Sequence, residues 1–421
     1  MSAALHRSLS SLAIPNYRRF FIGQVVSMSG NWMQNVAAMW LVLHLTGSGT
    51  AVGLTAAAQF LPLLLFGAWG GLLADRIPKR TLLMITQGLM ALPALALFVL
   101  VATDSAQAWM VIALVFAGGL VTAFDNPARQ AFVIEIVGGD RVVSAVGLNS
   151  VVVHTSRIAG PAAAAGVIAL GGVGPCFLLN ALSFLVMLVA LRRMEPRALH
   201  PAPPTRRQPG QLRDAVRYVA ATPSLRLPLT MMAVIGTFSF NFPTLLPLLA
   251  RYTFDGTATT LALLTSALAV GSVAGALTIG AREHVDRRFM IAAALAFGAL
   301  TLATAAAPTF ALMLVALTAT GLASVSFSAG TNSAVQLASD PEMRGRVMAL
   351  YSIVFIGSTP IGAPIVGWLA GAIDPRAGLA LGAVAAIATA LVAGGVAWRN
   401  VARGTQAARS RRPASRPAGR G

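Results

Sequence analysis

Cysteine is almost absent from this sequence: Cys176 is the only one among 421 residues. A disulfide within the chain is therefore excluded, and the five histidines are scattered, so no Cys/His metal spacing occurs. A Gly-rich loop ending in Lys-Ser/Thr, which would hold nucleotide phosphates, is also missing. We predict no metal and no cofactor. The start of the chain lacks an apolar core followed by a small-residue cleavage site, so we expect no removable signal peptide.

Charged residues are scarce as well. They make up 10% of the chain, against about 25% in soluble domains. Hydrophobic residues make up 56%, and the mean hydropathy is +0.75. Such a chain has too little polar surface for water, so we predict an integral membrane protein.

Apolar runs of about 20 residues, the length that crosses the hydrocarbon as a helix, recur along the chain. Strands of a membrane barrel would alternate in short segments instead. We therefore predict an all-α protein with twelve transmembrane helices. The predicted spans are 20–45, 51–74, 81–103, 108–127, 142–170, 174–191, 227–250, 258–281, 288–306, 309–331, 346–372 and 377–398.

The basic residues behind the net charge of +18 are divided unequally between the two sides of the membrane. If successive spans alternate in direction, almost all of the 31 lysines and arginines fall on the side that holds both termini. Only Arg251 and Arg376 fall on the other side, and Arg157 lies inside a span. Because cytoplasmic loops carry the excess of Lys and Arg, both termini are predicted to be cytoplasmic. The charge therefore does not indicate nucleic-acid binding.

The chain divides into two halves that resemble each other. A Pro-rich stretch and the amphipathic "LRDAVRYVA" separate the sixth span from the seventh. "DNPARQ" at 125–130 matches "TNSAVQ" at 331–336, as an old duplication of six spans would produce. The predicted parts are an N-terminus (1–19), a six-helix bundle (20–191), a linker (192–226), a second bundle (227–398) and a basic, disordered, lipid-attracted tail (399–421).

The stretch "GLLADRIPKR" places one acid and three bases at the cytoplasmic end of the second span. Gly71 has no side chain, so a neighbouring helix can approach it closely. Asp75 can meet the positive N-terminal dipole of another helix, and Arg76 can pair with Asp125 at the end of the fourth span. These contacts would form a latch between the halves; for Lys79 and Arg80 simple anchoring of the loop is favoured.

This stretch resembles the loop between the second and third spans of the major facilitator superfamily, with Pro78 in place of a glycine. "NYRRFFIGQVVSMSGNWM", "FDNPARQAFV", "FLLNALSFL", "RYVAATPSLR" and "RGRVMALYSIVFIGSTPIGAPIVGWLAG" are similar to the branch that contains the enterobactin exporter and macrolide efflux proteins. The resemblance implies two six-helix halves around a central cavity. It also implies that the partner of Asp75 is the eleventh span, which begins near Arg346.

Polar residues inside spans are costly unless they line water or pair with one another. A stripe on the first span and two sets on the seventh and tenth spans are candidates for a cavity wall, with interhelical or own-helix hydrogen bonds as the alternative. Pro243 must distort the seventh span. The candidate cavity residues are Gln24, Ser27, Asn31, Gln34, Asn35, Asn241, Thr320, Ser324 and Ser328.

The fifth span contains a buried charge. His154 and Arg157 stand at i and i+3, followed by Gly160 and Pro161. "RIAGPAAAAG" resembles a motif that this superfamily associates with exporters, in which Gly-Pro gives a kink and a close helix contact. Arg157 is a coupling candidate or a structural side chain, and His154 titrates near neutral pH or is a satisfied core residue. No acid lies deep within a predicted span, which leaves Asp125, Asp75 or His154 as proton carriers.

The function predicted from these features is secondary active efflux of a small amphiphile, such as a siderophore, a macrolide or another drug-like metabolite, by alternating access. The protein is expected to be a proton-driven monomer in the bacterial inner membrane, in contact with lipid. The alternatives are an importer or lipid-metabolite transporter of the same fold, and a receptor or scaffold that does not transport. No set of residues for an enzyme is present.

Overall fold

A computed structural model of the chain describes residues 10–200, 211–280 and 286–410, and these ranges contain helices and no strand. The first half consists of α2 (Pro15–Thr46), α3 (Gly49–Arg76), α4 (Lys79–Ala102), α5 (Ala108–Val137), α6 (Val142–Gly171) and α7 (Gly174–Arg192). The second half consists of α9 (Pro223–Ser239), α10 (Phe242–Leu248), α11 (Ala258–Gly280), α12 (Arg287–Ala306), α13 (Phe310–Ala338), α14 (Arg344–Gly357), α15 (Thr359–Ala372) and α16 (Pro375–Ser410). A short helix, α8 (Gln211–Ala221), precedes the second half.

Eleven helical segments among the described residues are long and apolar enough to cross a membrane. α2 is not one of them because polar side chains in its middle lower its hydropathy. It is nevertheless 32 residues long and packs inside the first bundle against α5, α6 and α7. With α2 included, the chain is an all-α membrane protein with the predicted twelve spans in two six-helix halves.

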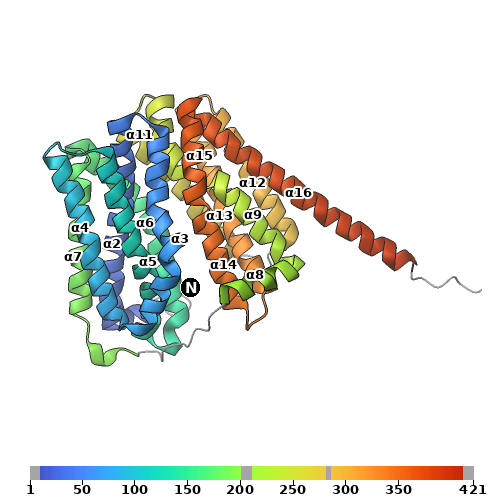
Figure 1. Ribbon diagram of the computed structural model, residues 1–421, viewed down its shortest axis with the longest axis horizontal. Coiled ribbons are helices and arrows are strands. Elements are labelled where there is room, and N and C mark those ends of the chain that lie inside the picture. Colours follow the sequence, from blue (N-terminus) through green and yellow to red (C-terminus); the bar gives the residue numbers. More distant parts are fainter. Residues whose placement is uncertain (1–9, 201–210, 281–285, 411–421) are drawn as a thin grey trace, which may run out of the picture.

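The halves lie side by side (Figure 1) and are built on the same plan. α3 packs on α5 as α11 packs on α13, and α4 packs on α7 as α12 packs on α16. Glycines permit the close approaches: a Cβ on Gly70 would strike the carbonyl of Ala123, and one on Gly275 would strike that of Leu322. This correspondence is the one that the sequence repeat predicts.

Several helices are longer than their predicted spans. α5 was expected to end at 127 but continues through Pro127 to Val137. α16 reaches Ser410, so residues 399–410 are helical where a disordered tail was predicted, and residues 411–421 lie outside the described part. The apolar "AFVIEIV" after Pro127 explains the extension of α5, since a proline kinks a helix without always ending it.

Two spans are broken. The seventh ends as α9 at Ser239 and resumes as α10 at Phe242, as expected from Pro243, and then passes into a π-helical turn, Leu249–Thr253. The eleventh, predicted as one unbroken span, is interrupted at Ser358, just before Pro360. Ser358 Oγ donates to the carbonyl of Phe355 at 2.7 Å and so compensates part of the break.

The linker helix α8 packs on the second half. Ala215 and Val219 are buried, whereas its other side has exposed residues, the amphipathic pattern expected for "LRDAVRYVA". It contacts α9 and α14, and the hydroxyl of Tyr218 accepts a hydrogen bond from the backbone N–H of Asp340 at 3.1 Å. The helix is thus tied to the protein through one face.

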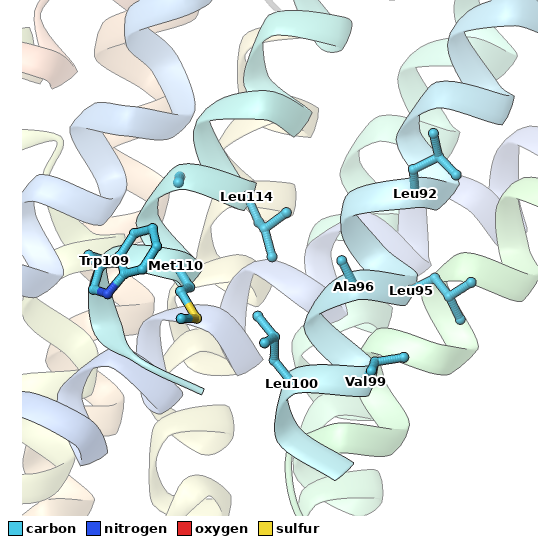
Figure 2. Close-up of a pocket in the computed structure, with 9 residues that line it drawn as sticks. Leu92, Leu95, Ala96, Val99, Leu100, Trp109, Met110 and Leu114 are labelled. Atoms are coloured by element: carbon cyan, nitrogen blue, oxygen red, sulfur yellow. The ribbon is translucent and has the colours of Figure 1, made fainter. Parts of the chain in front are cut away.

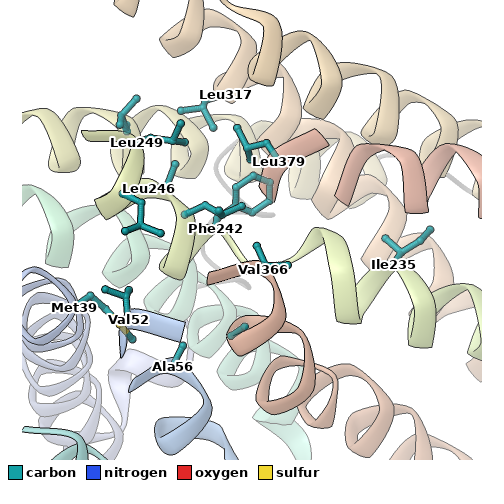
Figure 3. Packing of buried hydrophobic residues seen from close by; sticks show 14 of the residues in the cluster. Met39, Val52, Ala56, Ile235, Phe242, Leu246, Leu249, Leu317, Val366 and Leu379 are labelled. Atoms are coloured by element: carbon teal, nitrogen blue, oxygen red, sulfur yellow. The ribbon is translucent and has the colours of Figure 1, made fainter. Parts of the chain in front are cut away.

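We call the end of the molecule with Arg76, Lys79, Arg141 and Arg192 the basic end, and the end with the α2–α3 and α4–α5 loops the opposite end. One buried hydrophobic cluster joins the halves near the opposite end. Figure 3 shows Met39, Val52 and Ala56 of the first half beside Leu246 and Val366 of the second.

The basic end of the first half has a core of its own. Phe20, Leu82, Phe132, Ile136 and Leu191 belong to a second cluster whose members all come from the first half. The halves therefore pack against each other through hydrophobic residues near the opposite end. The basic end of the first half is stabilised by its own core.

Candidate functional site

A buried ion pair lies within α5. Asp125 is only 2% exposed, and Nε and Nη2 of Arg129 donate to its Oδ2 at 2.9 and 2.7 Å. Its Oδ1 accepts from Thr86 Oγ1 at 2.6 Å and from Gln87 Nε2 at 2.8 Å, both on α4. A buried carboxylate requires such a set of donors, because desolvation of an unpaired charge costs several kcal/mol.

This geometry corrects two expectations. Asp125 is not at the end of its span, because α5 continues for twelve residues beyond it, so an acid does lie deep in a helix. Arg76 is not its partner: Arg76 is exposed, and both oxygens of Asp125 are occupied by residues of α4 and α5.

The polar stripe of α2 is directed toward its own bundle. Gln24 Nε2 donates to Asn149 Oδ1 of α6 at 2.6 Å, and Ser27 Oγ donates to Gln87 Oε1 at 3.3 Å. Gln34 Oε1 accepts from Asn180 Nδ2 of α7 at 2.8 Å. These contacts are those of the interhelical alternative, and Gln24 and Ser27 are buried rather than exposed to a cavity.

Two other stripe residues are half-buried. Asn31 Oδ1 accepts a long hydrogen bond of 3.5 Å from Asn180, and Asn35 lies one turn further along α2. Through Gln87, Ser27 is also connected to Asp125, so the α2 stripe and the buried ion pair form one hydrogen-bonded network.

Lys79 and Arg80 bind inside the first half. Lys79 Nζ lies 2.8 Å from Glu135 Oε1, an ionic contact without an aligned hydrogen bond. Arg80 donates to the carbonyls of Leu191 at 2.8 Å and Arg192 at 3.1 Å at the end of α7. Both contacts fit the anchoring alternative, since a cation at a helix C-terminus binds its free carbonyls.

The other members of the predicted latch are dispersed. Arg346 Nη1 lies 3.8 Å from Asp214 Oδ2 of α8, a partly exposed pair. Gly71 is buried, and its neighbour Gly70 makes a tight helix contact. Asp75 is half-buried at the last turn of α3.

Arg157 lies midway along α6, above the ring of Trp32 on α2. Its Cζ is 5.1 Å from the ring centroid, within the range of a cation–π contact. Gly160 lies against α2, where a Cβ would meet the Trp32 side chain and the carbonyl of Ser29, so the expected close helix contact exists. Pro161 is accommodated inside a continuous α6. The side chain of His154 lies outside the described part.

The polar candidates of the second half bond to nearby carbonyls or to a neighbouring helix. Asn241 Nδ2 donates to the carbonyl of Thr237 at 2.7 Å, beside the break in the seventh span. Ser324 and Ser328 donate to the carbonyls of Gly321 and Val325, at 2.8 and 3.3 Å. Thr320 Oγ1 lies 2.9 Å from Thr304 Oγ1 of α12. Asn241, Thr320 and Ser324 are buried, so they do not line an open cavity in this conformation.

Two hollows lie near the opposite end. The smaller, about 200 Å³, is lined by Trp40, His44, Arg251 and Tyr252, and there the hydroxyl of Tyr252 donates to the carbonyl of Gly47 at 2.7 Å, which links the halves. The larger, about 590 Å³, is an apolar groove between α4 and α5 (Figure 2). Leu92 and Trp109 on its rim are exposed, as expected of a face that contacts lipid.

Sequence reasoning missed the partners in the buried network, namely Thr86, Gln87 and Arg129. The predicted fourth span ends at 127, which places Arg129 in a loop. The i, i+4 spacing of Asp125 and Arg129 and the apolar residues after them were the available signals. Among the described residues, no group of three or more His, Cys, Asp or Glu that could hold a metal occurs.

Curated relatives of the chain are transporters. It is 26% identical to the staphyloferrin A transporter of Staphylococcus aureus over 62% of its length and 66% of the relative's. It is 23% identical to macrolide efflux protein A of Streptococcus pyogenes, covering 81% of this chain and 85% of that one. With the enterobactin exporter EntS of Citrobacter koseri it shares 24% identity over 86% and 87% of the two chains.

Solved structures with the same fold are also transporters. The D323A mutant of nucleoside transporter NupG superposes with a TM-score of 0.72 at 12% identity, covering 91% of this chain and 99% of that one. A bacterial homologue of ferroportin in an inward-facing state gives 0.70 at 14% identity, covering 90% and 97%. A family model described as "transmembrane secretion effector" matches residues 6–416. The chain is therefore a transporter, not an enzyme, and belongs to the transmembrane secretion effector family of the major facilitator superfamily.

Proposed function

We propose that this protein is a secondary active exporter that moves a small amphiphilic compound out of the cell across the bacterial inner membrane. Several relatives are named as exporters or efflux proteins, which supports the outward direction. The observation that carries the proposal is the unequal packing of the halves: a shared core near the opposite end and an independent core in the basic end of the first half.

This asymmetry fits one state of alternating access. When the halves are joined near the opposite end, a cavity between them would open toward the basic end, which we assign to the cytoplasm from its arginines and lysines. Export then requires the halves to separate near Gly49 and Gly367, whose backbones touch, and to meet at the basic end. Asp75 and Arg76 are the residues that we assign to the latch of that second state.

Within the cavity we assign Asn31 and Asn35, which are half-buried on α2. We propose protons as the coupling ion, with Asp125 as the carrier, because its network reaches the α2 stripe through Gln87 and Ser27. Arg129 would then hold the charge of Asp125 between proton transfers.

The proposal is tested by efflux of a panel of siderophores and macrolides. Cells with and without the protein are loaded with each compound, and its retention is measured before and after the proton gradient is collapsed with an uncoupler. We expect at least one compound to be retained less in cells with the protein, and we expect the uncoupler to abolish that difference. Inverted vesicles should accumulate the same compound. Uptake by whole cells, with no efflux of any compound, would instead identify an importer.

A further inference from the structure

Arg157 places a positive charge in the middle of the molecule, and no described residue supplies an anion for it. It lies about 20 Å along α6 from either end of the helix, farther than its side chain extends. Residues 141–194 contain no Asp or Glu, and neither do α2 and α11, which pack against α6. The two acids of α5 are paired, Asp125 with Arg129 and Glu135 with Lys79.

The flat face of the Arg157 guanidinium contacts an aromatic ring, whereas its N–H edge has no partner among the described residues. Trp32 covers the face at 5.1 Å, and among the described residues no hydrogen-bond acceptor or carboxylate contacts the N–H groups. The Arg157 side chain is exposed, so its edge is accessible to a ligand. An arginine edge of this kind matches the two oxygens of a carboxylate.

Trp32 shares one side of α2 with Asn35 and Met39. Met28, Trp32, Asn35 and Met39 follow one another at i, i+4, i+7 and i+11, which places them on one side of the helix. Met39 belongs to the hydrophobic cluster that joins the halves, and Figure 3 shows it near Leu246 of the second half. Asn35 is half-buried, and none of the described residues satisfies its side-chain amide.

We infer that Arg157, Trp32 and Asn35 form a binding site for the anionic group of an aromatic or amphiphilic substrate. Arg157 binds the carboxylate through its edge, the ring of Trp32 packs against the apolar body, and the Asn35 amide adds a hydrogen bond. A substrate anion also neutralises a charge that is costly at the centre of a bilayer. The inference deepens the proposed function, because it names the class of compound that would be exported.

Binding of a matched pair of probes tests the site. The full chain in lipid nanodiscs is equilibrated with radiolabelled 2-naphthoate or with 2-naphthamide, which has the same ring system and no charge. We expect naphthoate to bind about tenfold or more tightly. Arg157→Gln should abolish this preference and leave naphthamide binding within about twofold, and Arg157→Lys should retain part of it. Arg251→Gln, which removes an exposed arginine at the opposite end, should leave the preference intact.

The outcomes separate this inference from the proposed function. Equal binding of the two probes by the wild-type protein, no binding of naphthoate, or an unchanged preference in monodisperse Arg157→Gln protein would each overturn the anion site. Because the measurement does not require transport, a preference that depends on Arg157 would stand even if no compound were exported. If cells export some compound but the protein does not bind naphthoate more tightly than naphthamide, the exporter proposal stands and the anion site is refuted.

Discussion

Arg129 donates twice to the same oxygen of Asp125, one helical turn earlier in α5, through Nε at 2.9 Å and Nη2 at 2.7 Å. Together with Thr86 and Gln87, this pair places a buried polar network at the interface of α4 and α5. Removal of one partner would leave an uncompensated buried charge, whereas removal of both would not.

Arg129→Gln is therefore expected to destabilise the protein by about 3 kcal/mol or more, and the double variant Asp125→Asn with Arg129→Gln by clearly less. The midpoint of thermal unfolding in detergent measures the stability of both variants. Asp125→Asn alone is measured as well, so that the three variants form a double-mutant cycle with the wild-type protein. If the double variant is less stable than Arg129→Gln alone, the pair does not act as a compensated unit.

The orientation in the membrane is testable by cysteine labelling. Cys176 is buried, so its replacement by alanine provides a background without accessible thiols. Ser105 at the opposite end and Glu342 at the basic end are both exposed. We expect a membrane-impermeant maleimide to label Ser105→Cys in intact cells and Glu342→Cys only after permeabilisation. The reverse pattern would place the basic end outside and remove the basis for the proposed direction.

Asp75→Asn is expected to insert and fold normally while export falls roughly tenfold, since a latch between two states contributes a coupling of that size. Initial rates of efflux, compared at equal amounts of protein in the membrane, provide the measurement. Asp255→Asn changes an exposed acid at the opposite end and serves as the control. Export at the wild-type rate by Asp75→Asn would eliminate the latch.

Helix contacts at glycine give a prediction on stability. A Cβ at Gly70 strikes the carbonyl of Ala123, so Gly70→Ala should cost about 1–3 kcal/mol through overpacking. Gly88 on α4 has open space around it, and Gly88→Ala should be neutral or stabilising by up to about 1 kcal/mol. Thermal unfolding of the two variants compares them directly, and equal midpoints would contradict the close packing of α3 on α5.

The sequence by itself determined the helical membrane fold, the two halves and the asymmetry of positive charge. These features depend on local properties: about 20 apolar residues must form a helix in lipid wherever they occur, because the backbone has no other hydrogen-bonding partner there. The break at Pro243 is equally local. Even the family was recognisable from short stretches such as "GLLADRIPKR".

Only the tertiary structure decided which polar groups meet. Gln24 bonds to Asn149 across 125 positions, and Asp125 takes partners from α4 that are 38 and 39 residues away. Helical periodicity shows that residues share a face but not which neighbour that face meets, so the α2 stripe was compatible with the favoured cavity wall and also with interhelical bonds. The predicted end of α5 was too early for a related reason. Hydropathy alone places charged residues outside the bilayer, whereas the structure buries Asp125 among Arg129 and two side chains of α4.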